Sequence, residues 1–340
     1  MNIKPQQFAV LAAVTALAVV ASALTYGSVN RWATGKVEGK LLLPTFARDV
    51  ASANEIEIVQ GEKKLVLERA GDQWRLKERD GYPANAERVR ALLLALQRSE
   101  LIEPRTAAKD KLKLLELEDP TAKDAKSRSL RVLDAKARPL AEIVLGKARN
   151  DAFGSGKGGA YVRRPAETQT WLATGEFRAP VEVRDWVQTT VFELDSSKIA
   201  RVTIEHPGED PLVIEKGDEK QKFKVSVIPE GVKLKDGANV DQIASGFASI
   251  DLDDMRKLDK APPFDKPVVI KLEADGGPGG TFRIRRDGDT AWLSFEATGE
   301  GDAKKAADDI NARVKGWEFK IPTWKADQIG KRRADLFDLS

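Results

Sequence analysis

The residues that could carry chemistry are few in this chain of 340 residues. It has no cysteine, which excludes disulfides, thiolate metal sites and cysteine nucleophiles. Its one histidine, His206, stands before Pro207 in a turn without a second ligand or nucleophile nearby, so a structural role is expected. The sequence therefore predicts no catalytic residue, no metal site and no cofactor.

Two short motifs have residue types suited to ligands, but their spacing does not match the known patterns. The glycine-rich run at residues 154–159 contains Lys157, yet it lacks the phosphate-loop spacing and precedes a strand pattern, so a hairpin loop is predicted. Asp251, Asp253 and Asp254 could hold a hard cation, but the glycine and glutamate of a calcium loop are missing. These acids are predicted to form a solvated helix end.

Consecutive basic residues form a cluster near the C-terminus. Lys331, Arg332 and Arg333 could contact anionic lipid headgroups or an acidic partner, and the alternative is a solvated helix face. Elsewhere 56 basic residues are interleaved with 53 acidic ones, and the net charge is only +3. This pattern does not indicate a nucleic-acid surface. Four tryptophans are predicted to be packing residues: Trp186, Trp292, Trp317 and Trp324.

Residues 8–26 carry no charge and can span a bilayer as a helix of about 28 Å. We expect an uncleaved membrane anchor, and a cleaved secretory signal ending at the Ala21-Ser22-Ala23 pattern is the alternative. Both interpretations put the protein in the export system. We expect a single-pass protein of the bacterial inner membrane with a periplasmic body, although the cations after the segment favour the opposite orientation. The predicted anchor residues are Phe8, Val10, Leu11, Val14, Leu17, Val19, Val20, Leu24 and Tyr26.

The rest of the chain shows strand patterns followed by a helix pattern, and this order occurs twice. In the first copy, strand runs at 56–58, 65–69 and 74–76 precede a helix pattern headed by Asn85. In the second copy, runs at 202–204, 212–214 and 223–225 precede a helix pattern headed by Asn239 and extending to Ile250. Further strand runs follow both copies, at 130–172 and 268–295, and a basic helix is predicted over 326–337.

The repetition predicts an α+β protein with an N-terminal transmembrane helix and two duplicated domains, each an antiparallel sheet with a packed helix. With 41% hydrophobic residues, the chain can bury two cores. The predicted division is a membrane anchor or signal at 1–30, a tether at 31–54, and repeat domains at 55–195 and 196–340.

Four features carry a resemblance to a known family. They are the N-terminal membrane segment, the Trp74 hairpin before an Asn-headed helix, the run Leu117-Glu118-Asp119-Pro120, and the closing pattern at 316–322 with Asp335-Leu336. With these features the chain resembles the bacterial "domain of unknown function" family numbered 4340. The resemblance implies an envelope protein, often encoded beside an ABC transporter similar to gliding-motility export systems. It implies no catalytic residues.

We therefore expect a non-catalytic, membrane-anchored accessory or scaffold subunit of an envelope transport complex. Its expected partners are the inner membrane and integral-membrane transporter subunits. A second hypothesis is a periplasmic module that binds lipid or glycan in a cleft between the two domains. A hydrolase comes third, because it would need convergent acid and nucleophile side chains that sequence spacing does not reveal.

Overall fold

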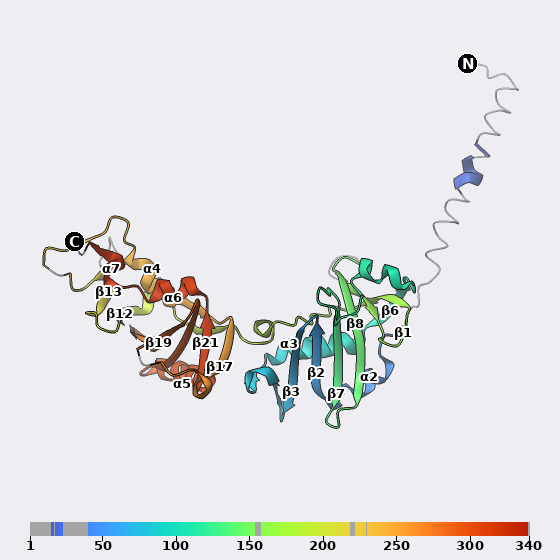
Figure 1. Ribbon diagram of the computed structural model, residues 1–340, viewed down its shortest axis with the longest axis horizontal. Coiled ribbons are helices and arrows are strands. Elements are labelled where there is room, and N and C mark those ends of the chain that lie inside the picture. Colours follow the sequence, from blue (N-terminus) through green and yellow to red (C-terminus); the bar gives the residue numbers. More distant parts are fainter. Residues whose placement is uncertain are drawn as a thin grey trace, which may run out of the picture. The chain divides into compact units, whose positions relative to one another are not determined.

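The computed structural model describes residues 15–16, 18–22, 40–153, 158–217, 222–228, 230–264 and 266–338. The chain is a mixed α+β protein rich in sheet, and it divides into two compact units (Figure 1). The first unit comprises Met1–Arg69 and Glu87–Val181; the second comprises Ala70–Ala86 and Glu182–Ser340. A short stretch of the first half, Ala70–Ala86, thus belongs to the compact unit of the second half.

The first unit is built on an antiparallel sheet with the strand order β1-β6-β10-β9-β8-β7-β2-β3 (Figure 1). Strands β2, β3, β7, β8, β9 and β10 lie at runs that the sequence predicts, whereas β1 and β6 were not predicted. The bounds are β1 Lys40–Leu41, β2 Ala53–Gln60, β3 Lys63–Ala70, β6 Glu100–Pro104, β7 Arg128–Asp134, β8 Pro139–Arg149, β9 Gly159–Arg163 and β10 Thr170–Thr174.

The second unit has an eight-stranded antiparallel sheet with the order β14-β13-β12-β18-β19-β20-β21-β17. Its bounds are β12 Ile199–Glu205, β13 Leu212–Lys216, β14 Phe223–Val225, β17 Asp254–Lys257, β18 Val268–Ala274, β19 Gly279–Asp287, β20 Thr290–Thr298 and β21 Trp317–Ile321. Shorter pairs are β4 Gln73–Leu76 with β5 Tyr82–Pro83, β11 Thr190–Glu193 with β16 Ser249–Asp251, and β15 Lys233–Leu234 with β22 Phe337–Asp338.

Helices pack on the sheets of both units. They are α2 Pro44–Asp49, α3 Ala86–Arg98, α4 Val240–Ser245, α5 Asp302–Val314, α6 Thr323–Ile329 and α7 Arg333–Leu336. In the first unit α3 buries Val89, Leu92 and Leu96 at helical spacing. Val144 points to the opposite face from its strand neighbours, and there it packs with Leu117 and with part of the 3₁₀ segment Lys109–Leu115.

Aromatic rings fill the core of the second unit. The rings of Phe192 and Phe295 both lie against Phe282, with centroids 5.0 Å apart in each pair. Such edge-on and stacked pairs add stability beyond the area they bury. This core joins the two-stranded β11–β16 sheet to the eight-stranded sheet.

Several expected elements differ from the observed ones. Ile250 was expected on the helix headed by Asn239, but α4 ends at Ser245, a 3₁₀ turn follows, and Ile250 lies in β16. Gly246 begins that turn, and a larger residue would not fit there, because a Cβ would lie 2.5 Å from a methyl group of Ile329. Asp251 and Asp254 accordingly lie on strands and not at a helix end.

Three other regions also depart from the sequence-based prediction. The basic helix predicted over 326–337 is two helices, α6 and α7, separated at Gly330. Helix α5, which packs against β20, was not predicted. Within the predicted tether, residues 40–54 form β1, α2 and the start of β2, and Phe46 of α2 is fully buried. This part of the tether is integral to the first unit.

The predicted membrane anchor lies mostly outside the described residues. Val19 and Val20 lie in helical backbone with exposed side chains, and the other predicted anchor residues are not described. Within the described ranges no helix has the length and apolar character needed to cross a membrane.

Candidate functional site

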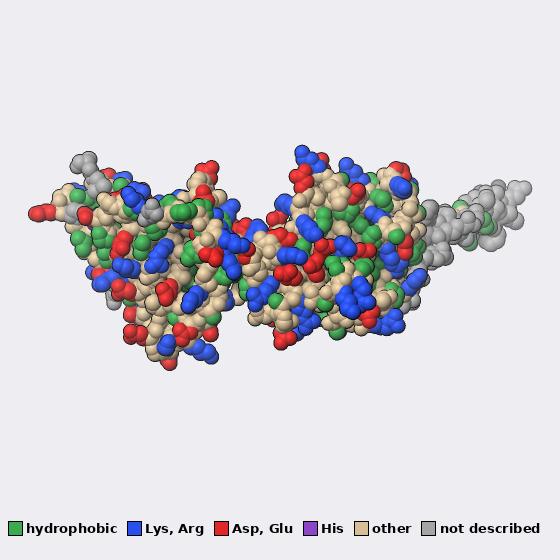
Figure 2. Space-filling view, turned by 60° about the horizontal axis from the view of Figure 1, so that its bottom comes forward, with side chains coloured by type: hydrophobic (Ala, Val, Ile, Leu, Met, Phe, Trp, Pro, Cys, Tyr) green, Lys and Arg blue, Asp and Glu red, His purple; other side chains and the backbone are tan. Residues whose placement is uncertain are grey.

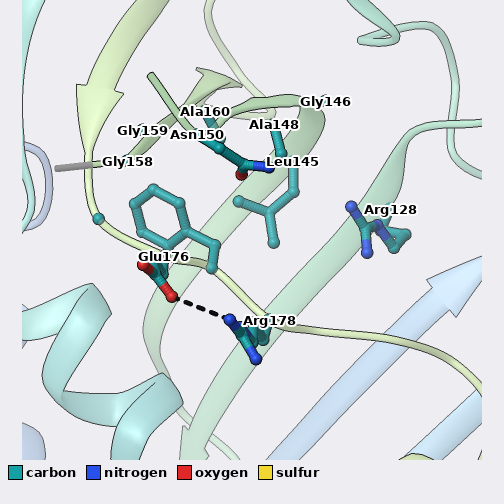
Figure 3. A pocket seen from close by; sticks show the side chains of 12 residues that line it. Arg128, Leu145, Gly146, Ala148, Asn150, Gly158, Gly159, Ala160, Glu176 and Arg178 are labelled. Carbon is teal, nitrogen blue, oxygen red and sulfur yellow. Dashed lines mark hydrogen bonds and ion pairs between the residues drawn. The ribbon is translucent and has the colours of Figure 1, made fainter. Parts of the chain in front are cut away.

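A pocket of 320 Å³ opens in the first unit at one end of the sheet (Figure 3). Strands β7, β8 and β9 supply part of its wall, and the segment after β10 supplies the rest. That segment carries Glu176, Phe177 and Arg178. The volume lies within the range of small-molecule sites.

Glycines give the pocket its shape, because backbone from neighbouring segments approaches them closely. A Cβ at Gly146 would lie 2.3 Å from the carbonyl oxygen of Leu115, and one at Gly159 would lie 2.5 Å from that of Ala173. Gly175 has a φ of +125°, which other residues rarely adopt. Because these residues lack side chains, the strands and the segment after β10 can pack closely around the pocket.

Arg128 is the unusual charge of this pocket. It is the first residue of β7 and pairs with Leu145 of β8, so both side chains lie on the same face of the sheet (Figure 3). Its Nη1 donates a long hydrogen bond of 3.4 Å to the carbonyl oxygen of Ala179. Its Nε is buried and has no hydrogen-bond partner in the described part of the protein.

Burial lowers the pKa of Arg128, and the negative charge of Glu116 opposes that shift. Among the described residues, Arg128 forms no ion pair. A guanidinium carries five N–H donors and stays charged in proteins. The pocket thus presents a partly desolvated positive charge whose donors are mostly unused.

The exposed edge of the pocket is close to neutral. Arg178 Nη2 donates to Glu176 Oε2 at 3.3 Å, and both side chains are largely exposed (Figure 3). Such a surface pair contributes little to stability. Its groups are therefore free to rearrange around a bound molecule.

The second unit has a wider hollow of 650 Å³, lined by Trp317, Lys257 and Asp80 among others. The Trp317 ring meets the Tyr82 ring edge-on, with centroids 4.9 Å apart, and Lys257 Nζ lies 5.9 Å from its centroid. Tyr82 comes from the β5 strand of the Ala70–Ala86 stretch. Its phenol is buried, which raises its pKa, and Arg313 opposes the shift.

Two of the three predicted contact residues at the C-terminus are engaged within the second unit. Arg332 forms an ion pair with Glu209. Arg333 donates to the carbonyl oxygen of Pro211 at 3.2 Å, and its guanidinium lies over the Phe337 ring. Lys331 is half-buried at the turn before α7. Arg332 and Arg333 thus both contact the segment at residues 209–211 of the second unit.

The other candidates from the sequence lie apart from one another. His206 is buried, and its Nε2 lies 2.9 Å from the carbonyl oxygen of Gly330, so Nε2 donates and ties β12 to the end of α6. Asp251 accepts from Thr190, while Asp253 and Asp254 pair with Arg184 and Arg79. Across the ranges that the structure describes, no three metal-binding side chains converge.

The predictions for the glycine-rich run and for the tryptophans are only partly confirmed. Residues 154–157 lie outside the described residues, whereas Gly158 and Gly159 line the 320 Å³ pocket. Trp186 is fully buried, as expected for a packing residue. Trp324 is 64% exposed, so its assignment as a packing residue was wrong.

Comparison with known proteins identifies the protein family of this chain. The family described as "Domain of unknown function (DUF4340)" matches residues 74–267, more than half of the 340 residues. The chain belongs to the DUF4340 family. Among curated proteins no relative matches it, and no solved structure matches it. The DUF4340 match contains every residue that lines the 320 Å³ pocket.

Sequence reasoning missed Arg128, although a signal for it exists. Arg128 precedes Leu130 and Val132 at intervals of two, and both of these are buried. The alternation therefore places Arg128 on the buried face of its strand. A charged residue in phase with a buried stripe needs a partner or a function.

Proposed function

We propose that this DUF4340 protein is a non-catalytic accessory subunit of an envelope transport complex. Residues 1–30 anchor it in the inner membrane as a single-pass protein, and the two units act in the periplasm by binding integral-membrane transporter subunits. The uncharged run at residues 8–26 carries this proposal, because it has the length and composition of a membrane-spanning helix.

Family membership and the chemistry of the surface support the proposal. The resemblance to DUF4340 envelope proteins supplies the association with an ABC-type transporter. On the visible face of each unit, basic and acidic side chains are interspersed (Figure 2). The side chains that could have served catalysis, His206 and Asp254 among them, take part in structural contacts. Such a protein is suited to recognition more than to chemistry.

We further propose that the two units arose by duplication. The strand order β3-β2-β7-β8-β9-β10-β6 in the first unit corresponds, position by position, to β13-β12-β18-β19-β20-β21-β17 in the second. Helices α3 and α4 come at the same place in the two orders, after the opening strands and before β6 and β17. This agreement supports two repeat domains, near 55–195 and 196–340, on one transporter-binding scaffold.

A ligand-binding module is the second candidate, and the 320 Å³ pocket favours it. A pocket of that size with a partly desolvated arginine fits a small anion better than a long lipid or glycan. Binding of a small molecule and binding of a transporter are compatible functions.

Affinity purification tests the accessory-subunit proposal. The tagged full-length protein is recovered from detergent-solubilised membranes, beside a version that lacks residues 1–30, and co-purified proteins are identified by mass spectrometry. We expect transporter subunits with the full-length protein. Recovery with both versions places recognition in the two units, whereas recovery of no membrane transport protein with either version overturns the proposal.

A further inference from the structure

We propose that the 320 Å³ pocket of the first unit binds a small monocarboxylate with an apolar body, and that Arg128 is the residue that holds the carboxylate. The inference does not depend on the accessory-subunit function, because it rests on the pocket alone. It assigns a ligand class to a site that family membership leaves without one.

The charge in the pocket points to an anion. Arg128 is half-buried on the core face of the sheet, and in the described residues its one hydrogen bond is the 3.4 Å contact to Ala179. A partly desolvated cation without a carboxylate partner is less favourable in the protein alone than one paired with an anion. A ligand carboxylate supplies the missing partner, since its two oxygens match the parallel N–H groups of a guanidinium.

The charged side chains that line the pocket favour a ligand with a single negative charge. Glu176 and Arg178 pair with each other at the pocket edge, so Arg128 is the unpaired charge among the lining residues (Figure 3). A carboxylate matches one positive charge. A phosphate dianion would carry an excess of negative charge into a partly buried site, which is costly.

The side chains that line the pocket favour a ligand whose remaining part is apolar. The buried side chains of Leu145 and Phe177 and the methyl group of Ala160 line the same space as Arg128. Leu145 is the cross-strand partner of Arg128, so a ligand held by the guanidinium meets an apolar side chain at once. Asn150, which follows β8, also lines the pocket and offers an amide to a polar end of the ligand (Figure 3).

Calorimetry on the full-length protein in detergent tests the assignment. Hexanoate and benzoate are the probes, and hexanamide and benzamide are their uncharged counterparts. We expect each acid to bind about 10- to 100-fold more tightly than its amide, the range for one hydrogen-bonded charge pair. Equal binding of acid and amide, or no binding of either acid at millimolar concentrations, overturns the proposal.

Substitutions then locate the site. Arg128→Met should weaken acid binding by about 10- to 100-fold without lowering the urea midpoint, because it removes a cation that lacks a protein partner. Arg131→Met is the matched control, since Arg131 lies on the same strand but on the other face, paired with Glu57 and Glu142. It should leave acid affinity unchanged. Unaltered affinity in Arg128→Met, or an equal loss in Arg131→Met, overturns the assignment.

Inorganic phosphate separates the two anion chemistries. We expect phosphate to leave hexanoate affinity unchanged at millimolar concentration. Displacement of hexanoate by phosphate would overturn the choice of a monocarboxylate. The acid–amide comparison uses the unsubstituted protein, so it remains decisive even if Arg128→Met does not fold.

Discussion

Among the described residues of the second unit, Glu318 of β21 is the most deeply buried acid, and its removal gives the sharpest prediction about stability. The residue is 2% exposed and accepts hydrogen bonds from Arg256 of β17 and Arg285 of β19. Arg285 also donates to the carbonyl oxygen of Pro262 at 2.8 Å, and Arg256 stacks on the Trp292 ring at 3.7 Å. One carboxylate thus holds two guanidinium groups from different strands.

Replacing Glu318 with Gln keeps the shape of the side chain but removes the charge that the two arginines share. Breaking a buried ion pair from one side costs about 3–5 kcal/mol. Asp287 lies 3.7 Å from Arg256 and offsets part of that loss. We expect Glu318→Gln to lower the free energy of unfolding by about 3 kcal/mol, near the lower end of this range.

Urea denaturation followed by tryptophan fluorescence measures this change. Trp74, Trp186, Trp292, Trp317 and Trp324 all belong to the second unit, so the signal reports mainly on it. With a slope of about 1–3 kcal/mol per molar urea, the midpoint should fall by at least about 1 M.

Glu296→Gln serves as the control for the loss of a carboxylate. Glu296 lies on β20 of the same sheet and its side chain is exposed. Its replacement should change the free energy of unfolding by less than about 0.5 kcal/mol. If Glu318→Gln changed stability as little as Glu296→Gln, the reasoning about the buried charge cluster would be refuted.

Three further predictions concern both units. Burial raises the pKa of Glu57, but the hydrogen bond and charge of Lys64, with those of a neighbouring arginine, lower it overall. Its stabilisation should be present above a pH of about 4.3 and lost as pH falls through the lower folded pKa; urea midpoints should therefore fall less on acidification in Glu57→Gln. Gly146→Ala should cost about 1–3 kcal/mol, measured by urea denaturation, because its Cβ would lie 2.3 Å from the Leu115 carbonyl oxygen. Tyr82→Phe should leave the thermal midpoint nearly unchanged, whereas Tyr82→Leu should lower it, since the edge-on ring contact with a neighbouring tryptophan is lost.

Each of these three predictions has an outcome that contradicts it. The Glu57 interpretation fails if Glu57→Gln and the parent protein lose stability in parallel on acidification. An unchanged urea midpoint in Gly146→Ala would mean that the approach of the Leu115 backbone is not limiting. Equal thermal midpoints for the two Tyr82 variants would show that the aromatic contact does not stabilise the second unit.

The strands were predictable because their side chains alternate between a buried and a solvent-facing side. The runs around Ile56, Leu130 and Phe282 all lie in strands at the predicted places. Helix α5 was not predicted, although its residues Ala303, Ala307, Ile310 and Val314 are buried at helical spacing. Two of these residues are alanines among many charges, so the apolar stripe is weak. Small side chains suffice because β20 lies close by, which a sequence does not reveal.

Ile250 shows how tertiary contacts override a helical pattern. The spacing from Val240 through Ile243 and Phe247 continues to Ile250, but the chain leaves the helix after Ser245. Pairing with β11 makes Ile250 part of a strand. Both conformations bury the same apolar residue, so hydrophobic spacing alone does not separate them.

The pocket was harder to predict than the fold because its parts are far apart in sequence. Arg128 begins β7, Gly159 begins β9, and Phe177 follows β10. The glycine-rich run was recognised, yet it was interpreted as a hairpin loop alone. Only the register of the sheet brings its end, Gly159, into one pocket with a buried-face arginine.

Site-directed photo-cross-linking in intact cells tests the central proposal most directly, namely that the protein acts by binding transporter subunits. Benzoylphenylalanine replaces exposed apolar residues in both units, Leu114, Val227, Phe264 and Trp324, and the buried Phe46 serves as the control position. Cross-linked products are identified by mass spectrometry. The account predicts adducts with an integral-membrane transport protein from exposed positions and none from Phe46. Membrane-localised protein without such adducts at any exposed position would contradict it.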